Sequence, residues 1–329
     1  MLRSFTIESG ALRPMSEDTA LKLPAEAVWL DLVGPTDEEE RALEQALGID
    51  IPTRTEVSGI QTSDRLSVRG ATLYMSAFVP TGPPSAPTMV PVTFVRTDDR
   101  LITVRYTSVA SLDDFIARFS GGEAGLGGAG DLFAALLETI VDRIADRLEK
   151  VGEALEKLSR GIFHHPGAVA RRAGRRLPQR RRIDRLEAVI EDIGTQHEIA
   201  GTLRECLHSL IRLVAFSDEH ADDGLRRRLK AIGADLHSVG EHNGYLVADM
   251  EFMLDATVGL IDIQQNKVIY ILSIVSVVLT PPVVVASVYG MNFEHMPELA
   301  WPYGYGWALG LMLVSAIGPY LVFKLRGWL

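Results

Sequence analysis

The chain has 329 residues, of which 47% are hydrophobic and 23% are charged, and its formal net charge at pH 7 is −10. The negative charge argues against a nucleic-acid-binding protein, because such proteins neutralise phosphate groups with basic side chains. Cys206 is the single cysteine, which excludes an intrachain disulfide and a metal site made of two thiolates. We therefore interpret Cys206 as a packing residue.

Residues 1–120 are predicted to form an α/β domain. Apolar and β-branched runs indicate strands at residues 27–33, 66–79, 90–96 and 101–106, and helical patterns cover residues 36–47 and 112–119. Thr36 resembles a helix N-cap, and Glu39 three residues later completes a capping box. No motif of an active site stands out in this domain.

A glycine-rich stretch follows at residues 121–130 and contains the pattern G-x-G-x-x-G at Gly125, Gly127 and Gly130. A dinucleotide-binding loop requires a strand directly before these glycines and an acid at the end of a second strand about 20 residues later. Both are missing, because helical patterns lie on either side. The stretch is therefore predicted to be a flexible linker between domains.

Two long helices are predicted to form an antiparallel hairpin over residues 131–224. Apolar residues recur every three or four positions in two series, at residues 133–162 and 183–214. The tip between them contains proline, glycine and the arginines of residues 171–182. We interpret these arginines as a solvated charged turn, and docking on anionic lipid is the alternative.

A third helix is predicted over residues 225–290, first as a stalk and then as a membrane span. Residues 268–288 carry no charged side chain and, at a rise of about 1.5 Å per residue, can cross a hydrocarbon layer of about 30 Å. Residues 303–323 form a second such span. The third helix would be about 100 Å long, so the stalk and the first span form one rod that can transmit motion.

The two spans form a hairpin that places both chain ends on one side of the membrane. No signal peptide is apparent before the N-terminal domain, so this side is expected to be the cytoplasm. The basic tail at residues 324–329 agrees with this orientation, because the loop at residues 289–302 has two glutamates and neither Lys nor Arg. We expect a protein of the cytoplasmic (inner) membrane whose loop faces outward.

Polar residues form a stripe along the rod. Its members are Asp255, Asp262, Asn266, Ser273, Ser276, Thr280 and Ser287. Such side chains are costly against lipid and are expected to face protein or water. Packing against another helix is one explanation of the stripe. A pore is favoured, because acids lie at the lower end of the stripe, Asn292 lies beyond its upper end, and Pro281 and Pro282 donate no amide hydrogen. One hairpin cannot enclose a pore, so several copies must associate into rings of these residues.

The sequence YGMNFEHMPEL, residues 289–299, resembles the signature of the CorA metal-ion transporter family. The resemblance extends through NKVIYILSIVSVVLTPPVVVASVYGMN and the ending YLVFKLRGWL, and more loosely through the layout of the whole chain. The fold class is thus α+β, with an N-terminal α/β domain, a long helical stalk and a C-terminal transmembrane hairpin. The resemblance implies a funnel-shaped homopentamer in which five long helices line the pore and the second spans form an outer ring.

The resemblance also implies roles for individual residues. By position, the outer selectivity motif is Gly290, Met291 and Asn292, the residues that line or constrict the pore are Asn266, Leu272 and Thr280, and Asp255 forms an acidic ring in the stalk. Thr280 departs from the bulky apolar residue that the family often has, so a tight hydrophobic gate is not expected at this level. Asp262 is an additional acid.

The chemistry of Mg²⁺ explains the motif. Mg²⁺ loses water reluctantly and prefers six oxygen ligands, so a ring of Asn292 carbonyl oxygens is expected to hold the hydrated ion by hydrogen bonds. Glu294 and Glu298 are expected to concentrate cations at the outer mouth. The resemblance implies closure by cytosolic Mg²⁺ that bridges neighbouring subunits. The candidate regulatory ligands are Asp235, Glu241 and Asp249, with ordinary solvated positions as the alternative.

The predicted function is Mg²⁺ influx, with Co²⁺ and Ni²⁺ as further substrates. A zinc transporter of the same superfamily is the alternative, and the intact FEHMPEL after GMN counts against it. A membrane-anchored enzyme is a distant third. No nucleophile-base pair, metal-ligand motif or phosphate-binding loop in the sequence lies in the predicted structural context that its function requires. The expected partners are other copies of the chain, membrane lipids and divalent cations, and not nucleic acid.

Overall fold

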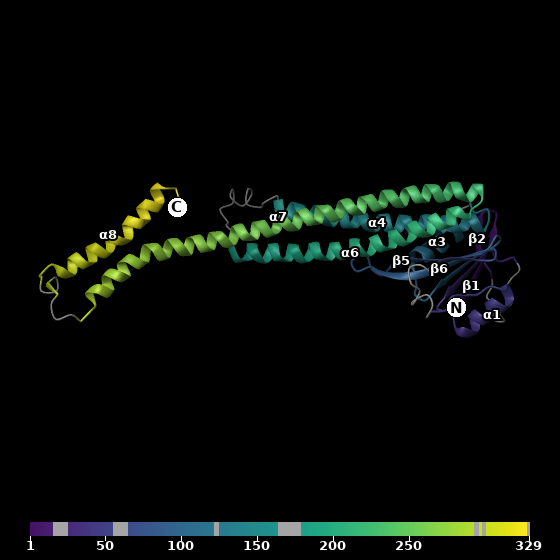
Figure 1. Cartoon of the computed structure of the whole chain (residues 1–329), viewed down its shortest axis with the longest axis horizontal. Coiled ribbons are helices and arrows are strands. Elements are labelled where there is room, and N and C mark those ends of the chain that lie inside the picture. Colours follow the sequence, from purple (N-terminus) through teal and green to yellow (C-terminus); the bar gives the residue numbers. More distant parts are fainter. Residues whose placement is uncertain are drawn as a thin grey trace. The chain divides into compact units, whose positions relative to one another are not determined.

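The computed structural model describes residues 1–15, 26–54, 65–121, 125–163, 179–292, 296–297 and 301–327. The chain divides into two compact units. The first comprises Met1–Ala173 and Ala188–Leu254, and the second comprises Gly174–Glu187 and Asp255–Leu329. The first unit contains a sheet and long helices, and the second contains the two most apolar helical segments (Figure 1).

A mixed sheet forms the N-terminal part of the first unit. Its strands are β1 (Leu2–Glu8), β2 (Ala11–Pro14), β3 (Trp29–Val33), β4 (Leu66–Arg69), β5 (Thr72–Thr81), β6 (Thr88–Arg96) and β7 (Leu101–Arg105). They lie in the order β2-β1-β3-β7-β6-β5-β4. The central pair, β3 and β7, is parallel with Trp29 opposite Leu101, and the other described neighbours are antiparallel.

Helices cover both faces of the sheet, because successive side chains of a strand point to opposite faces. On one face, Leu30 and Val104 pack with Leu43 of helix α1 (Asp37–Leu47). On the other face, Trp29 lies edge-on to Phe115 of α3 (Ala110–Ser120), with 5.7 Å between ring centroids. The alternation of Trp29 and Leu30 along β3 thus supplies an aromatic core on one side and an aliphatic core on the other.

Several elements of this domain are confirmed. The predicted strands at residues 27–33, 90–96 and 101–106 correspond to β3, β6 and β7, and the predicted helices correspond to α1 and α3. The capping box is also confirmed, because Glu39 N donates to Thr36 Oγ1 at 3.3 Å and Thr36 N donates to Glu39 Oε2 at 3.0 Å.

The single strand predicted over residues 66–79 is wrong. The chain reverses there, and β4 pairs antiparallel with β5 across a turn in which Gly70 has φ +64°, a conformation that glycine adopts without strain. Strands β1 and β2 were not predicted. They are antiparallel to each other and joined by a turn at Ser9 and Gly10, both with positive φ.

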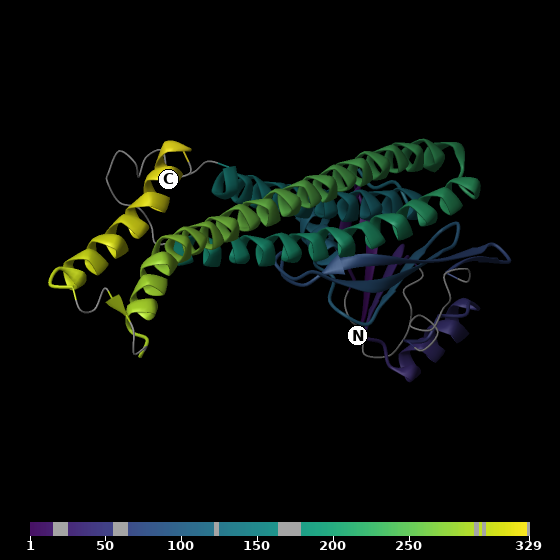
Figure 2. The ribbon, with the colours of Figure 1, turned by 60° about the vertical axis from the view of Figure 1, so that its left-hand side comes forward.

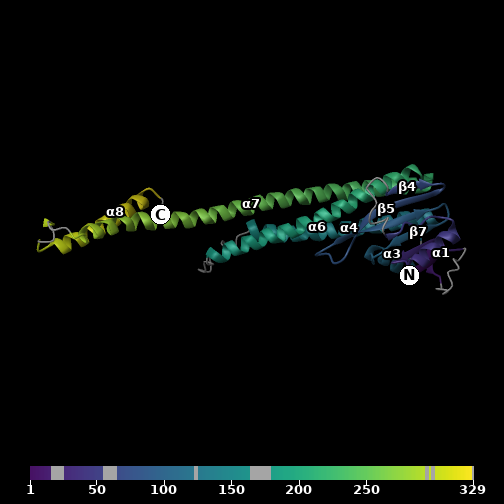
Figure 3. The ribbon, with the colours of Figure 1, turned by 60° about the horizontal axis from the view of Figure 1, so that its bottom comes forward.

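Three long helices run through the first unit: α4 (Ala129–Phe163), α6 (Gln179–Glu219) from Ala188 onward, and α7 (Asp223–Tyr289) up to Leu254. A Cβ at Gly130 would lie 3.5 Å from Leu225, and one at Gly152 would lie 3.6 Å from Leu246, so α4 and α7 run in the same direction. Helix α6 is antiparallel to α7 because it ends three residues before α7 begins. Figures 2 and 3 show these helices side by side along the sheet.

The glycine-rich stretch contacts the sheet where it is described. Leu126 is buried, and the backbone N–H groups of Gly125 and Leu126 both donate to the Gly10 carbonyl at 3.1 Å. Helix α3 precedes the glycines and α4 follows them, which is not the strand-loop-helix arrangement of a dinucleotide site.

The second unit contains the start of α6 up to Glu187, the rest of α7 and helix α8 (Gly304–Leu325). Helix α7 is continuous over 67 residues with Pro281 and Pro282 inside it, as the apolar pattern predicts. Both helices are long and apolar enough to cross a membrane. The N-terminal sheet, the long helices and the two apolar C-terminal helices confirm the predicted α+β architecture.

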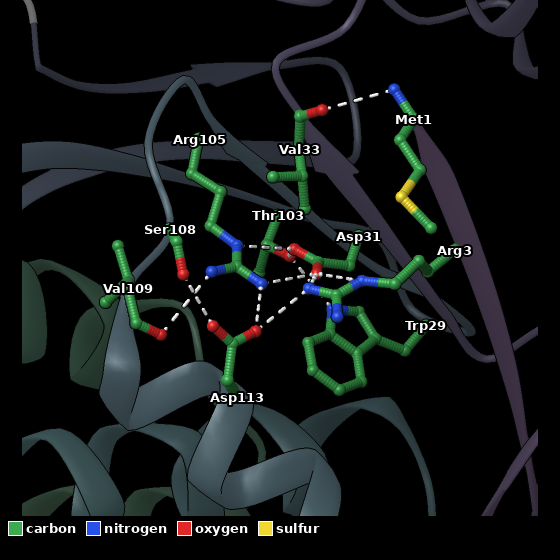
Figure 4. Close-up of polar contacts among 10 residues, drawn as sticks. All are labelled: Met1, Arg3, Trp29, Asp31, Val33, Thr103, Arg105, Ser108, Val109 and Asp113. Carbon is green, nitrogen blue, oxygen red and sulfur yellow. Dashed lines mark hydrogen bonds and ion pairs between the residues drawn. The ribbon is translucent and has the colours of Figure 1, made fainter.

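A buried network of charges joins three strands to α3 (Figure 4). Asp31 on β3 is fully buried and accepts hydrogen bonds from Arg105 Nη2 at 2.9 Å and from Arg3 Nη2 at 2.6 Å. The same two guanidinium groups donate to Asp113 Oδ1 on α3, at 2.9 Å and 3.1 Å. Two cations therefore face two carboxylates, with Asp31 and Arg105 fully buried and Arg3 and Asp113 partly exposed.

Burial and pairing have opposite effects on the ionisation of this network. Burial would lower the pKa of Arg105, but its hydrogen bonds to Asp31 and Asp113 outweigh this and raise the pKa. Burial would raise the pKa of Asp113, but hydrogen bonds from Arg105 and Ser108 lower it. The pairing therefore favours the charged forms of Arg105 and Asp113.

We predict that Asp31→Ala destabilises the protein by about 3–5 kcal/mol, because it leaves Arg105 buried with too little negative charge. The measurement is thermal or urea unfolding of the purified full-length chain. Arg69→Ala is the matched control, because it breaks an exposed ion pair: the side chains of Arg69 and Asp50 are 61% and 60% exposed. We expect this variant to lose less than about 1 kcal/mol of stability. Equal losses for the two variants would contradict the assigned role of the buried network.

Cys206 on α6 is buried, which confirms it as a packing residue, and burial raises the pKa of its thiol to about 12. Because the thiolate is the reactive form, we predict that Cys206 resists maleimide at pH 7.5 in the folded protein and reacts after unfolding. Mass spectrometry before and after denaturation measures this, and fast labelling of the folded chain would show that the thiol is accessible.

Candidate functional site

The candidate site is a polar stripe on α7. In the single chain its seven predicted members are exposed, and Leu272 beside them is 65% exposed. Asn266, Ser273, Thr280 and Ser287 follow one another at intervals of seven residues. Seven residues are about two helical turns, so these side chains lie above one another on one face of the helix.

The hydroxyl groups of the stripe donate their hydrogens to the backbone of α7. Ser273 Oγ donates to Ile269 O at 2.8 Å, Ser276 Oγ to Leu272 O at 2.9 Å, Thr280 Oγ1 to Ser276 O at 2.6 Å and Ser287 Oγ to Val283 O at 2.9 Å. A hydroxyl has one hydrogen and two lone pairs. Each oxygen is therefore left as an acceptor toward whatever it faces, a property that the sequence pattern alone does not reveal.

The two prolines leave backbone acceptors in the middle of the span. Pro281 and Pro282 lie inside α7 and have no N–H group, so the carbonyls of Val277 and Val278 have no helical donor. Within a hydrocarbon layer such carbonyls need water or another polar partner. This part of α7 is therefore suited to face water rather than lipid.

The GMN motif lies where α7 ends. Gly290 N donates to Ala286 O at 2.9 Å and Met291 N donates to Val288 O at 3.3 Å, which closes the last turn. A Cβ at residue 290 would approach the Ala286 carbonyl oxygen to 3.2 Å, so glycine allows this closure. Asn292 follows at once and is exposed.

Some predicted site residues lie outside the described part of the chain. These are Glu294 and Glu298 of the outer loop, together with the side chains of the arginine-rich tip at residues 171–182.

The three candidate regulatory acids do not converge within one chain. Asp235 and Glu241 are exposed on α7, and Asp249 is half-buried. Among the described residues, no group of three or more His, Cys, Asp or Glu side chains is placed to hold a metal ion. Any metal bound by these acids would need ligands from elsewhere.

Asp235 nevertheless has acidic neighbours on α4 that the sequence did not link to it. The pKa of Asp142 is raised by burial, and negative charges on Asp146, Glu138 and Asp235 add to this, whereas Arg118 opposes it. This electrostatic interaction depends on the parallel packing of α4 and α7, which periodicity in one helix does not reveal.

Helix α8 has the end groups of a membrane span. Exposed aromatic residues lie at its start, with Trp301 6.5 Å from Tyr303 and 6.3 Å from Trp307 between ring centroids. Lys324 and Arg326 lie at its other end. Tryptophan and tyrosine favour the interface between lipid and water, and basic residues favour the cytoplasmic side.

Comparison with known proteins gives consistent matches. A family model described as "CorA-like Mg2+ transporter protein" matches residues 24–325. The magnesium transport proteins CorA of Salmonella typhimurium and of Escherichia coli (strain K12) are each 32% identical over 334 aligned residues, which cover 100% of both chains. The solved CorA magnesium transporter from Methanocaldococcus jannaschii has a TM-score of 0.77 at 17% identity, covering 100% of this chain and 99% of that one. This last likeness supports the fold.

Proposed function

The chain belongs to the CorA-like Mg²⁺ transporter family, and from this we propose that it forms a homopentameric channel for Mg²⁺ influx across the cytoplasmic membrane. Co²⁺ and Ni²⁺ are proposed as further substrates, and cytosolic Mg²⁺ as the signal that closes the channel. Relatives over the full chain length are named magnesium transport proteins, which supports the substrate. The structural observation that carries the proposal is the stripe of acceptor oxygens that leads along α7 toward Asn292.

An acceptor-lined wall suits a hydrated cation. Water molecules around Mg²⁺ turn their oxygens to the ion and their hydrogens outward, and Mg²⁺ gives up this shell reluctantly. The surrounding wall must therefore accept hydrogen bonds. The hydroxyls of Ser273, Ser276, Thr280 and Ser287 do so because their own hydrogens are bound to the α7 backbone. Five copies of the stripe would repeat these acceptors around the axis.

Other residues take roles at different heights of the pore. Asn292 with Gly290 and Met291 forms the outer selectivity ring, and Glu294 and Glu298 concentrate cations before it. Asn266 and Leu272 line the inner part of the span. Asp255 and Asp262 below them form acidic rings that favour cations over anions.

Closure by cytosolic Mg²⁺ is proposed to use Asp235, Glu241 and Asp249. Asp235 is the best supported, because it adds negative charge to the α4 carboxylates around Asp142. Mg²⁺ that links these acids to a neighbouring copy would relieve their repulsion. If this arrangement exists only in the closed state, Mg²⁺ binding favours closure by the difference in affinity between the two states.

We predict that Asn292→Ala lowers Mg²⁺ influx by at least about tenfold, because the ring loses the amide oxygens that hold the hydrated ion. The measurement is influx into proteoliposomes or Mg²⁺-depleted cells, with membrane insertion and assembly checked by cross-linking. Gln264→Ala is the matched control, since residue 264 is an amide on the opposite face of α7, and we expect wild-type influx.

The same assay tests the alternatives. Proton-coupled Zn²⁺ influx in preference to Mg²⁺ would favour a zinc transporter. A strictly monomeric protein in bilayers would contradict the channel altogether.

We also predict that Ser273→Ala lowers Mg²⁺ influx about fivefold, because it removes one ring of acceptors without enlarging the side chain. Ser273→Thr retains the hydroxyl and is expected to stay within about twofold of the wild type. Influx equal to the wild type in Ser273→Ala would show that the ion does not depend on the stripe.

A further inference from the structure

Helix α7 contains two glycines in its stalk that close packing does not explain, Gly240 and Gly244. Within a single chain, a Cβ added at either residue would meet no atom within 4 Å, so the fold of the chain itself leaves room for a side chain there. Both residues lie well inside a helix of 67 residues. Glycine is the least favourable helix residue after proline, because it loses the most backbone freedom on folding. Residues 240–244 are therefore a locally weak part of the helix.

The residue between these glycines has an unsatisfied polar group. Asn243 is 1% exposed on the otherwise apolar face that α7 turns to the bundle. Its Nδ2 donates to the Ala200 carbonyl of α6 at 3.1 Å, but its Oδ1 is buried without a hydrogen-bond partner. A buried acceptor without a donor opposes the packed state, and water satisfies it once the helices part.

The facing part of α6 has the same character. Gly201 directly follows Ala200, and a Cβ there would also meet no atom within 4 Å. Gly259 is a further glycine of α7 with such space, but it lies in the second unit. The weak parts of α6 and α7 thus coincide at the level of Asn243.

The start of α7 is held firmly by contrast. Arg228 donates to both carboxylate oxygens of Glu138 on α4, at 2.9 Å and 2.8 Å, and to Asp131 Oδ1 at 3.1 Å. Arg226 donates to the Ala221 carbonyl at 2.6 Å. A force on α7 would therefore bend the helix at residues 240–244 before it displaced the start of the helix, which Arg228 holds.

We propose that residues 240–244 form a hinge at which α7 bends and parts from α6 when the channel opens. The purpose of the hinge rests on the proposed channel function, whereas its mechanics rest on the glycines and on Asn243. Bending exposes the unpartnered oxygen of Asn243 to water, and this gain offsets part of the packing that is lost when α7 leaves α6. A smaller signal is then enough to shift the population between the packed and the bent state.

The test is the double variant Gly240→Ala with Gly244→Ala in the full-length chain. Alanine strengthens the helix, so we expect higher thermal stability and slower amide hydrogen exchange at residues 240–248. We also expect Mg²⁺ influx about fivefold below the wild type, because the bent state becomes less populated. Gly233→Ala is the matched control: it makes the same change in the same helix, and its Cβ would lie at an ordinary 3.7 Å from Val214 Cγ1. It is expected to raise stability and leave influx unchanged.

Asn243→Leu is a second, independent variant. It removes the unpartnered oxygen, and we expect the same slower exchange and lower influx as for the alanine pair. Unchanged influx and exchange in both sets, or an equal fall in influx for Gly233→Ala, would overturn the hinge.

Loss of the oligomer in the double alanine variant would also overturn the hinge, because it would show that the glycines are a contact between copies of the chain. The wild-type protein could fail to transport Mg²⁺ while the variants still slow amide exchange at residues 240–248. That result would refute the channel function and support the hinge. Exchange thus separates the two proposals.

Discussion

Hydrocarbon offers no hydrogen bonds, and the second half of α7 is organised around this constraint. The hydroxyls of Ser273, Ser276, Thr280 and Ser287 donate to the carbonyls one turn below, so none of these four has a hydroxyl hydrogen left over. Their remaining lone pairs and the two carbonyls opposite the prolines still need donors, which lipid cannot supply. In the proposed channel, several copies around a water-filled axis would supply these donors.

The first unit provides a firm base for the start of this helix. The charges of Asp31, Arg105, Arg3 and Asp113 fix α3 to the centre of the sheet, and α3 packs beside α4. Arg228 then ties α4 to the start of α7. A chain of contacts therefore leads from the sheet to the stalk, and each contact in it is charged or closely packed. Movement of α7 is more easily accommodated beyond this base than within it.

Sequence patterns were sufficient where one local rule decides the structure. The capping box at Thr36, the helical periodicity and the uncharged runs led to the correct helices, and seven-residue spacing placed the stripe on one face of α7. They failed at residues 66–79, where Gly70 turns an apolar run into a hairpin. The buried network could not be predicted, because Arg3 and Asp113 are 110 residues apart in sequence. The orphan oxygen of Asn243 and the acids around Asp142 likewise depend on packing between helices.

The length of α7 has a mechanical consequence. From Gly244 to Tyr289 the helix rises about 70 Å, so a tilt of about 3° at the lower point displaces the upper end sideways by about 4 Å. That distance exceeds the diameter of a water molecule, although the local change in backbone angles is slight. In the proposed channel, a long lever of this kind would turn a small rearrangement among the stalk carboxylates into a change of aperture comparable to the size of a hydrated ion's water shell.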